Sequence, residues 1–85
     1  MSEATRLSVS VPEPVSSWVL DELQSDAYTG YLRRVHAGPV GQGTEWEEFV
    51  SRGCGLPKTV VLRVETVTGG DEVGRATTFE FTRRA

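Results

Sequence analysis

Hydrophobic and polar residues alternate along the first well-patterned stretch of the chain, residues 6–11. Its hydrophobic positions are Leu7, Val9 and Val11. A period of two residues predicts a strand with one buried face. Pro12 and Pro14 end this strand, because proline has no N–H to donate to a neighbouring strand. Residues 1–5 are expected to form a disordered tail.

The hydrophobic period becomes that of a helix after residue 14. Two successive stretches place hydrophobic residues three or four positions apart, which is typical of helices with one buried face. The first contains Val15, Trp18, Val19 and Leu23, and the second contains Tyr28, Tyr31, Leu32 and Val35. Asp26 is in position to cap the second helix, and Gly38-Pro39 ends it. Two helices are therefore expected after the first strand.

A third short helix is predicted over residues 44–51, after a glycine-rich loop at residues 38–43. Thr44 and Glu47 have the spacing of a capping box, in which each side chain satisfies a backbone N–H of the other residue. The apolar face of this helix would consist of Trp46, Phe49 and Val50.

The C-terminal third has the pattern of two strands. Residues 58–68 are rich in Val and Thr, and residues 75–83 alternate between polar and apolar. The glycines at 69 and 70 supply a turn, so the pattern predicts an antiparallel hairpin. Residues 6–85 are thus expected to form one small α+β domain, with an N-terminal strand, two to three short helices and a C-terminal antiparallel β-hairpin.

Composition narrows the class of protein. Eighty-five residues suffice for one domain with a modest core. The chain has 12 acidic against 9 basic residues, which argues against nucleic acid or an anionic membrane as a partner. No apolar run approaches the length of a membrane span, residues 1–6 lack the plan of a signal peptide, and the single Cys54 has no disulfide partner. These features favour the cytoplasm. The eight arginines against one lysine, with no Ile or Asn, suggest a high-GC bacterium or its phage.

No stretch of the sequence carries a recognisable catalytic, cofactor or metal motif. Cys54 and His36 are the one potential Cys–His pair, and they are too few for a zinc site. The acidic residues at 21–26 and 45–48 are expected to form solvated faces. The glycines of 38–43 lack the Lys-Ser/Thr of a phosphate-binding loop. The sequence therefore predicts a protein that is not an enzyme and needs no cofactor.

A non-enzymatic regulatory module that binds a partner protein is the predicted function. The proposed contact consists of Trp46, Glu47 and Phe49, because an aromatic side chain surrounded by acidic residues can anchor a partner protein. An edge of the C-terminal hairpin is a second contact. The partner is unidentified, and a homodimer through an edge strand is an open alternative. The arginines, Arg33 and Arg34 among them, would hold an acidic partner or a phosphate if the fold gathers them.

Two resemblances offer alternative functions. Residues 6–37 resemble the strand-helix-helix plan of ribbon-helix-helix repressors, which implies a dimer that reads DNA with Arg6, Ser8 and Ser10. The stretch GPVGQGTEW is similar to a strand-turn-strand of START-like domains, which implies a small-ligand cavity. In that interpretation residues 31–37 and 44–51 are strands.

Overall fold

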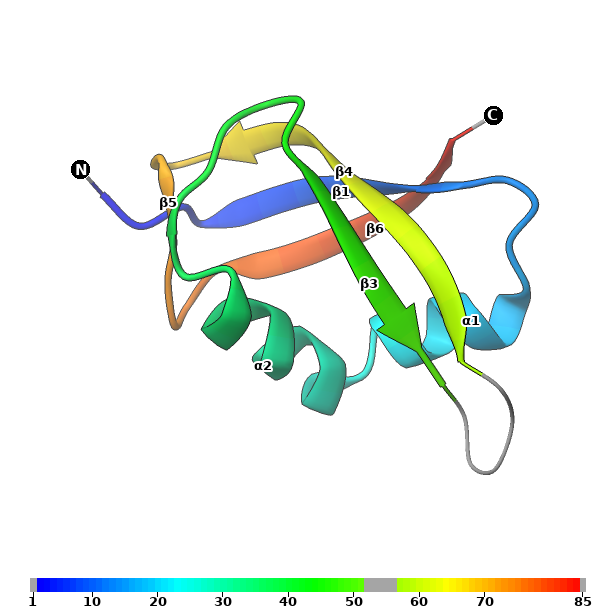
Figure 1. Cartoon of the computed structure of the whole chain (residues 1–85). Helices are drawn as coiled ribbons and strands as arrows, with labels where there is room; N and C mark the ends of the chain where they lie inside the picture. The colour runs from blue at the N-terminus through cyan, green and yellow to red at the C-terminus, as the bar shows by residue number, and fades with distance from the viewer. Residues whose placement is uncertain (1, 52–56, 85) are drawn as a thin grey trace.

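The computed structural model describes residues 2–51 and 57–84 as two helices, a four-stranded sheet and a two-stranded sheet (Figure 1). The elements in chain order are β1 (Arg6–Pro12), α1 (Ser17–Leu23), α2 (Asp26–Val35), β2 (Gly38–Pro39), β3 (Glu45–Val50), β4 (Lys58–Thr68), β5 (Glu72–Val73) and β6 (Thr78–Arg84). The predicted class, a single small α+β domain that starts with a strand, is confirmed.

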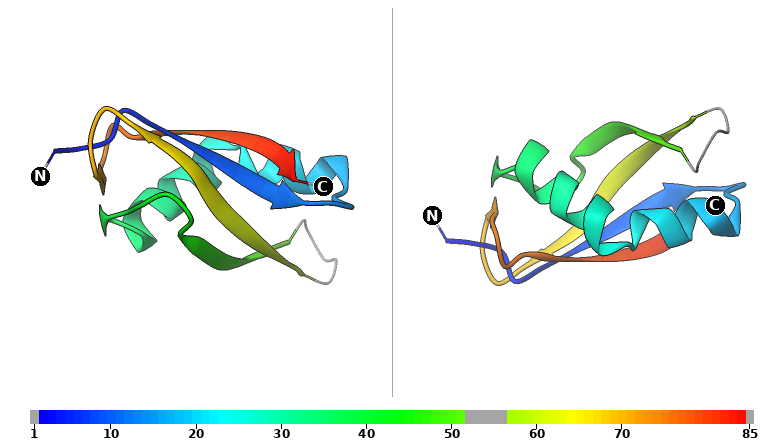
Figure 2. Two further views of the ribbon diagram at one scale, coloured as in Figure 1. Left: turned by 90° about the horizontal axis from the view of Figure 1, so that it is seen from above. Right: turned by 90° about the horizontal axis from the view of Figure 1, so that it is seen from below.

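The larger sheet has the order β3-β4-β1-β6. Strand β1 is antiparallel to β4 and parallel to β6, and β3 is antiparallel to β4. Both helices lie on one face of this sheet, and the other face is left open (Figure 2). The molecule therefore has two layers.

The predicted hairpin of 58–68 with 75–83 does not form as a directly paired unit. Strands β4 and β6 run in opposite directions, as expected, but β1 lies between them and pairs with both. The reason is burial: the three inward residues of β1 are Leu7, Val9 and Val11, and all are fully buried. A central position covers these side chains more completely than an edge does.

The third predicted helix is wrong, since residues 45–50 form strand β3. Burial alternates along this strand, and every residue has a partner on β4. The Thr44 hydroxyl accepts the N–H of Gly41 at 3.3 Å, so no capping box forms. The competing strand-turn-strand interpretation is half right, because residues 31–35 remain helical. Pairing with the long strand β4 decides the conformation of this short segment.

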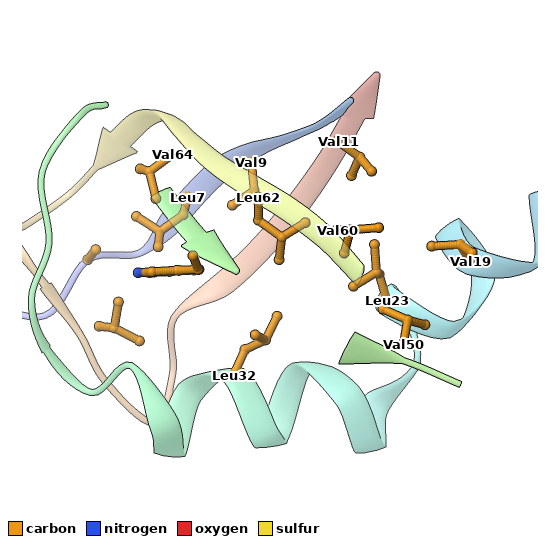
Figure 3. Close-up of a cluster of buried hydrophobic side chains, with 13 residues drawn as sticks. Leu7, Val9, Val11, Val19, Leu23, Leu32, Val50, Val60, Leu62 and Val64 are labelled. Carbon is orange, nitrogen blue, oxygen red and sulfur yellow. The ribbon is translucent and has the colours of Figure 1, made fainter. Parts of the chain in front are cut away.

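The two predicted helices are present, but only part of each predicted stripe is buried: Val19 and Leu23 in α1, and Leu32 in α2. Tyr31 and Val35, expected on the buried face of α2, are exposed. Ser25 rather than Asp26 caps α2, since its hydroxyl accepts the N–H of Tyr28 at 3.2 Å. The core lies between the helices and the sheet, and Figure 3 shows its main side chains. They are Leu7, Val9, Val11, Val19, Leu23, Leu32, Val50, Val60, Leu62 and Val64.

Residues 2–5, expected as part of a tail, contact the connection that contains β5. The N–H of Ala4 donates to the C=O of Glu72 at 2.7 Å, and Ala4 is buried. The C=O of Ala4 accepts the Thr77 hydroxyl, also at 2.7 Å. Residues 2–5 thus close one end of the core.

Candidate functional site

Strand β3 lies at an edge of the sheet and separates its side chains into two sets. Trp46, Glu48 and Val50 point inward and are buried. Glu47 and Phe49 point outward, to the open face. The predicted contact residues Trp46, Glu47 and Phe49 are therefore not on one surface.

The structure corrects the role expected for Trp46. Its ring is 8% exposed and stacks on the ring of His36, with centroids 4.1 Å apart and an interplanar angle of 6°. Its other neighbour is Phe79, which meets it edge-on at 6.3 Å. Trp46 fills the space between α2 and the sheet, so it cannot reach a partner at the surface.

Phe49 is the exposed aromatic residue of this strand. Its exposed fraction is 66%, well above that of the other large hydrophobic side chains at the surface, Val35 and Tyr31. Its cross-strand partner on β4 is Thr59, and the partner of Glu47 is the half-buried Val61. Among the residues that the structure describes, Glu47 makes no ion pair. We refer to Glu47, Phe49 and Val61 as the β3 surface.

Glu48, on the inward side of β3, is buried with polar partners from α2 and from His36, the residue that follows α2. Its carboxylate lies 2.5 Å from Nε2 of His36 and accepts the hydroxyl of Tyr31 at 3.1 Å. The side chain of Glu48 is 6% exposed, whereas the pattern of the sequence predicts a solvated acid. Helical spacing placed it on a polar face, and strand spacing places it among Trp46 and Val50. The alternation in EWEEFV is the signal that would have revealed it.

Two tyrosines of α2 surround this carboxylate. The hydroxyl of Tyr28 donates to the C=O of Phe49 at 3.0 Å. Burial, and then the nearby charge of Glu48, raises the pKa of Tyr28 well above its ordinary value. The hydrogen bond to Glu48 raises the pKa of Tyr31. Both phenols are thus held neutral against the strand.

These shifts predict an alkaline transition. Because the fold favours the neutral form of both phenols, their contribution to stability is complete below pH ~10 and is lost as the pH rises through the raised values. Tyr28 and Tyr31 are the two tyrosines of the chain. The ultraviolet absorption of tyrosinate should therefore appear at higher pH in the folded protein than in urea. Coincident titration curves would contradict the arrangement.

The residues of the ribbon-helix-helix interpretation lie on the central strand β1. Ser10 is buried, where it donates to Glu65 at 2.5 Å and accepts from Arg84 at 2.9 Å. Arg6 lies 3.9 Å from Glu80, and Ser8 is half-buried. Since β4 and β6 occupy both sides of β1, this strand has no edge with which to pair in a dimer. The strand-helix-helix plan exists in the chain, but not its dimerising arrangement.

Other candidate chemistry is limited to what the described residues hold. Cys54, one half of the potential Cys–His pair, lies outside residues 2–51 and 57–84, which the structure describes. Within those ranges no group of three His, Cys, Asp or Glu side chains is placed to hold a metal ion. The helices of the described part are too short and polar to cross a membrane.

The fold and the β3 surface define a small two-layer α+β domain with an open sheet face. The chain belongs to the family of unknown function DUF7968, which matches residues 1–85. A search of curated proteins gives no match, and neither does a search of solved structures.

Proposed function

We propose that the chain is a non-enzymatic protein-binding domain of the cytoplasm that contacts its partner through the β3 surface. The observation that carries this proposal is Phe49, an aromatic side chain 66% exposed on an edge strand. Exposed aromatic residues cost solvation free energy, and aromatic side chains supply much of the binding energy at protein interfaces. Both helices lie on the other face of the sheet (Figure 2).

The outer edge of β3 has backbone groups with which a strand of the partner could pair. Hydrogen bonds alternate along an antiparallel pair, so every second residue of an edge strand turns its backbone groups away from its neighbour. Phe49 is one of these residues, because its C=O accepts from Tyr28. By the same alternation, Glu45 and Glu47 direct their backbone N–H and C=O groups to the open edge. An added strand would pair with these groups.

The chemistry of the β3 surface favours a partner strand with an apolar residue and a lysine or arginine on the same side. The apolar residue would cover Phe49, and the cation would face Glu47. A second copy of the chain fits less well. An antiparallel register centred on Glu47 places this residue opposite its own copy, and like charges directly opposite are destabilising.

A random-peptide library displayed on phage tests this proposal. Selection on the immobilised protein should enrich extended peptides in which an apolar residue and a basic residue are two positions apart. Phe49→Ala should weaken binding of a selected synthetic peptide at least tenfold, as at an interface hot spot. Glu47→Lys should weaken it through charge repulsion.

Glu80→Lys is the matched control, because Glu80 is an exposed glutamate of β6, at the opposite edge of the same sheet. It should leave peptide affinity unchanged. Peptides that bind wild type and Phe49→Ala equally, or a selection without Phe49-dependent binders, would overturn the proposal. A concentration-dependent dimer in sedimentation, dissociated by Phe49→Ala, would instead identify a second copy as the partner.

A further inference from the structure

The structure gathers three arginines around an open groove between α2 and the connection from β5 to β6. The volume of the groove is about 390 Å³. It is lined by Gly30, Arg33, Arg34, Ala37, Gly74 and Arg75. Figure 1 shows that the C-terminal half of α2 lies beside the chain segment that follows β5. Arginines from two distant parts of the sequence therefore meet at one site.

The guanidinium groups of α2 converge over Gly30. The point at which a side chain on Gly30 would begin lies 3.6 Å from Nη1 of Arg34 and 4.0 Å from Nη2 of Arg33. Arg33 is held in place, since its Nη1 donates to the C=O of Thr77 at 3.1 Å. The absence of a side chain at Gly30 leaves room for a ligand atom between the two guanidinium groups.

These positive charges are not neutralised within the described part of the chain. The ion pairs found there involve Arg6, His36, Arg63 and Arg83, and none involves an arginine of the groove. Glu3 packs against Gly74 but lies beyond ion-pair distance of all three arginines. Three like charges at one groove repel one another unless an anion binds between them. This grouping contrasts with the formal charge of the whole chain, which is −3.

We propose that this groove binds a small organic phosphate. The planar guanidinium donates two parallel hydrogen bonds to a phosphate, which is why arginine is common in phosphate sites. A phosphate group placed over Gly30 would contact Arg33 and Arg34, with Arg75 on the opposite wall. The volume of about 390 Å³ is within the usual range for small-molecule sites and exceeds what one phosphate fills. The remainder of the ligand would lie along Ala37 and Gly74.

Titration followed by amide NMR tests the site with four probes at 150 mM KCl: inorganic phosphate, pyrophosphate, adenosine monophosphate and adenosine. This salt concentration screens general attraction between surface charges. The amide signals of Gly30 and Gly74 are expected to shift on addition of pyrophosphate and of adenosine monophosphate. Adenosine monophosphate should bind more tightly than inorganic phosphate, and adenosine should not bind.

Arg34→Gln should weaken binding about tenfold, the ordinary effect of losing one charge-assisted hydrogen bond. Arg83→Gln is the matched control, because it removes the same charge at an arginine that pairs with Glu13. Gly30→Glu places a carboxylate between the guanidinium groups and should abolish binding. Gly30→Gln, similar in size but neutral, should weaken it less.

The amide NMR spectrum of each variant shows whether it is folded. If Arg34→Gln unfolds the domain, Arg75→Gln takes its place. Equal losses for Arg34→Gln and Arg83→Gln would show general attraction to charge and overturn the site. So would shifts outside the groove, or binding of inorganic phosphate as tight as that of adenosine monophosphate. None of these outcomes depends on the β3 surface, so the two proposals fail separately.

Discussion

Replacement of Trp46 by alanine is expected to lower the free energy of unfolding by about 3–5 kcal/mol, the usual cost of removing a large aromatic side chain from a core. The ring is 8% exposed and contacts His36 and Phe79. A domain of this length has a total stability on the order of 5–8 kcal/mol, so the variant would be close to unfolding. Urea denaturation followed by circular dichroism measures the change.

Phe49→Ala is the control for Trp46→Ala, since it removes an aromatic ring from the same strand on the exposed side. We expect a change within about 0.5 kcal/mol, as for other surface substitutions. A large loss for Phe49→Ala with a small loss for Trp46→Ala would mean that the two faces of β3 are reversed. That result would also remove Phe49 from the proposed contact.

Glu48→Ala is expected to lower the free energy of unfolding by about 2–3 kcal/mol. The substitution removes the partner of both His36 and Tyr31 and leaves a cavity beside the indole ring. Leaving a buried hydrogen-bonding group without its partner costs about 1–3 kcal/mol, and the cavity left by the removed side chain adds to that cost. The same denaturation measurement applies.

Two further variants separate the causes of this effect. Glu47→Ala, the adjacent and exposed glutamate, should change stability by less than about 0.5 kcal/mol. The double variant His36→Leu, Glu48→Leu replaces the pair by apolar side chains and should recover much of the loss, because neither side chain of the pair is then left without its partner. Equal effects of Glu47→Ala and Glu48→Ala would show that Glu48 is solvated after all.

The sequence predicts the parts of this fold whose pattern is local and long. Strand β1 and both helices have several hydrophobic residues in an unambiguous period, and the structure contains all three elements. Residues 44–51 are too short for the period to decide, because Trp46, Phe49 and Val50 fit a helix while Trp46, Glu48 and Val50 fit a strand. The choice depends on pairing with β4, which is distant in sequence.

The position of β1 in the sheet likewise cannot be predicted from local sequence patterns. The alternating residues of 58–68 and 75–83 correctly indicate two strands of opposite direction, and a turn between them is consistent with their spacing. Strand β1 lies between these two strands, because a central position buries its side chains Leu7, Val9 and Val11. No pattern within the C-terminal third contains that information.

The candidate surfaces divide in the same way. Glu47 and Phe49 are exposed as the predicted contact requires, although they lie on a strand and not on a helix. Glu48 was expected in solvent because its helical position was polar. Arg75 is brought close to Arg33 and Arg34 only by the tertiary fold. The sequence alone could therefore predict an arginine site only if the fold gathered these residues.

The parallel pairing of β1 with β6 has a consequence for synthesis of the chain on the ribosome. Strand β1 emerges before every other strand, whereas its partner β6 is the last element of the domain. Contacts between residues so distant in sequence form late and slow the folding of a domain. Until β6 leaves the ribosomal tunnel, the backbone edge of β1 that pairs with β6 is free, and another strand can pair with it. The domain therefore completes its fold only after almost all of its residues have been made. A nascent chain halted earlier would leave β1, whose apolar side chains are fully buried in the finished fold, without one of its two neighbouring strands.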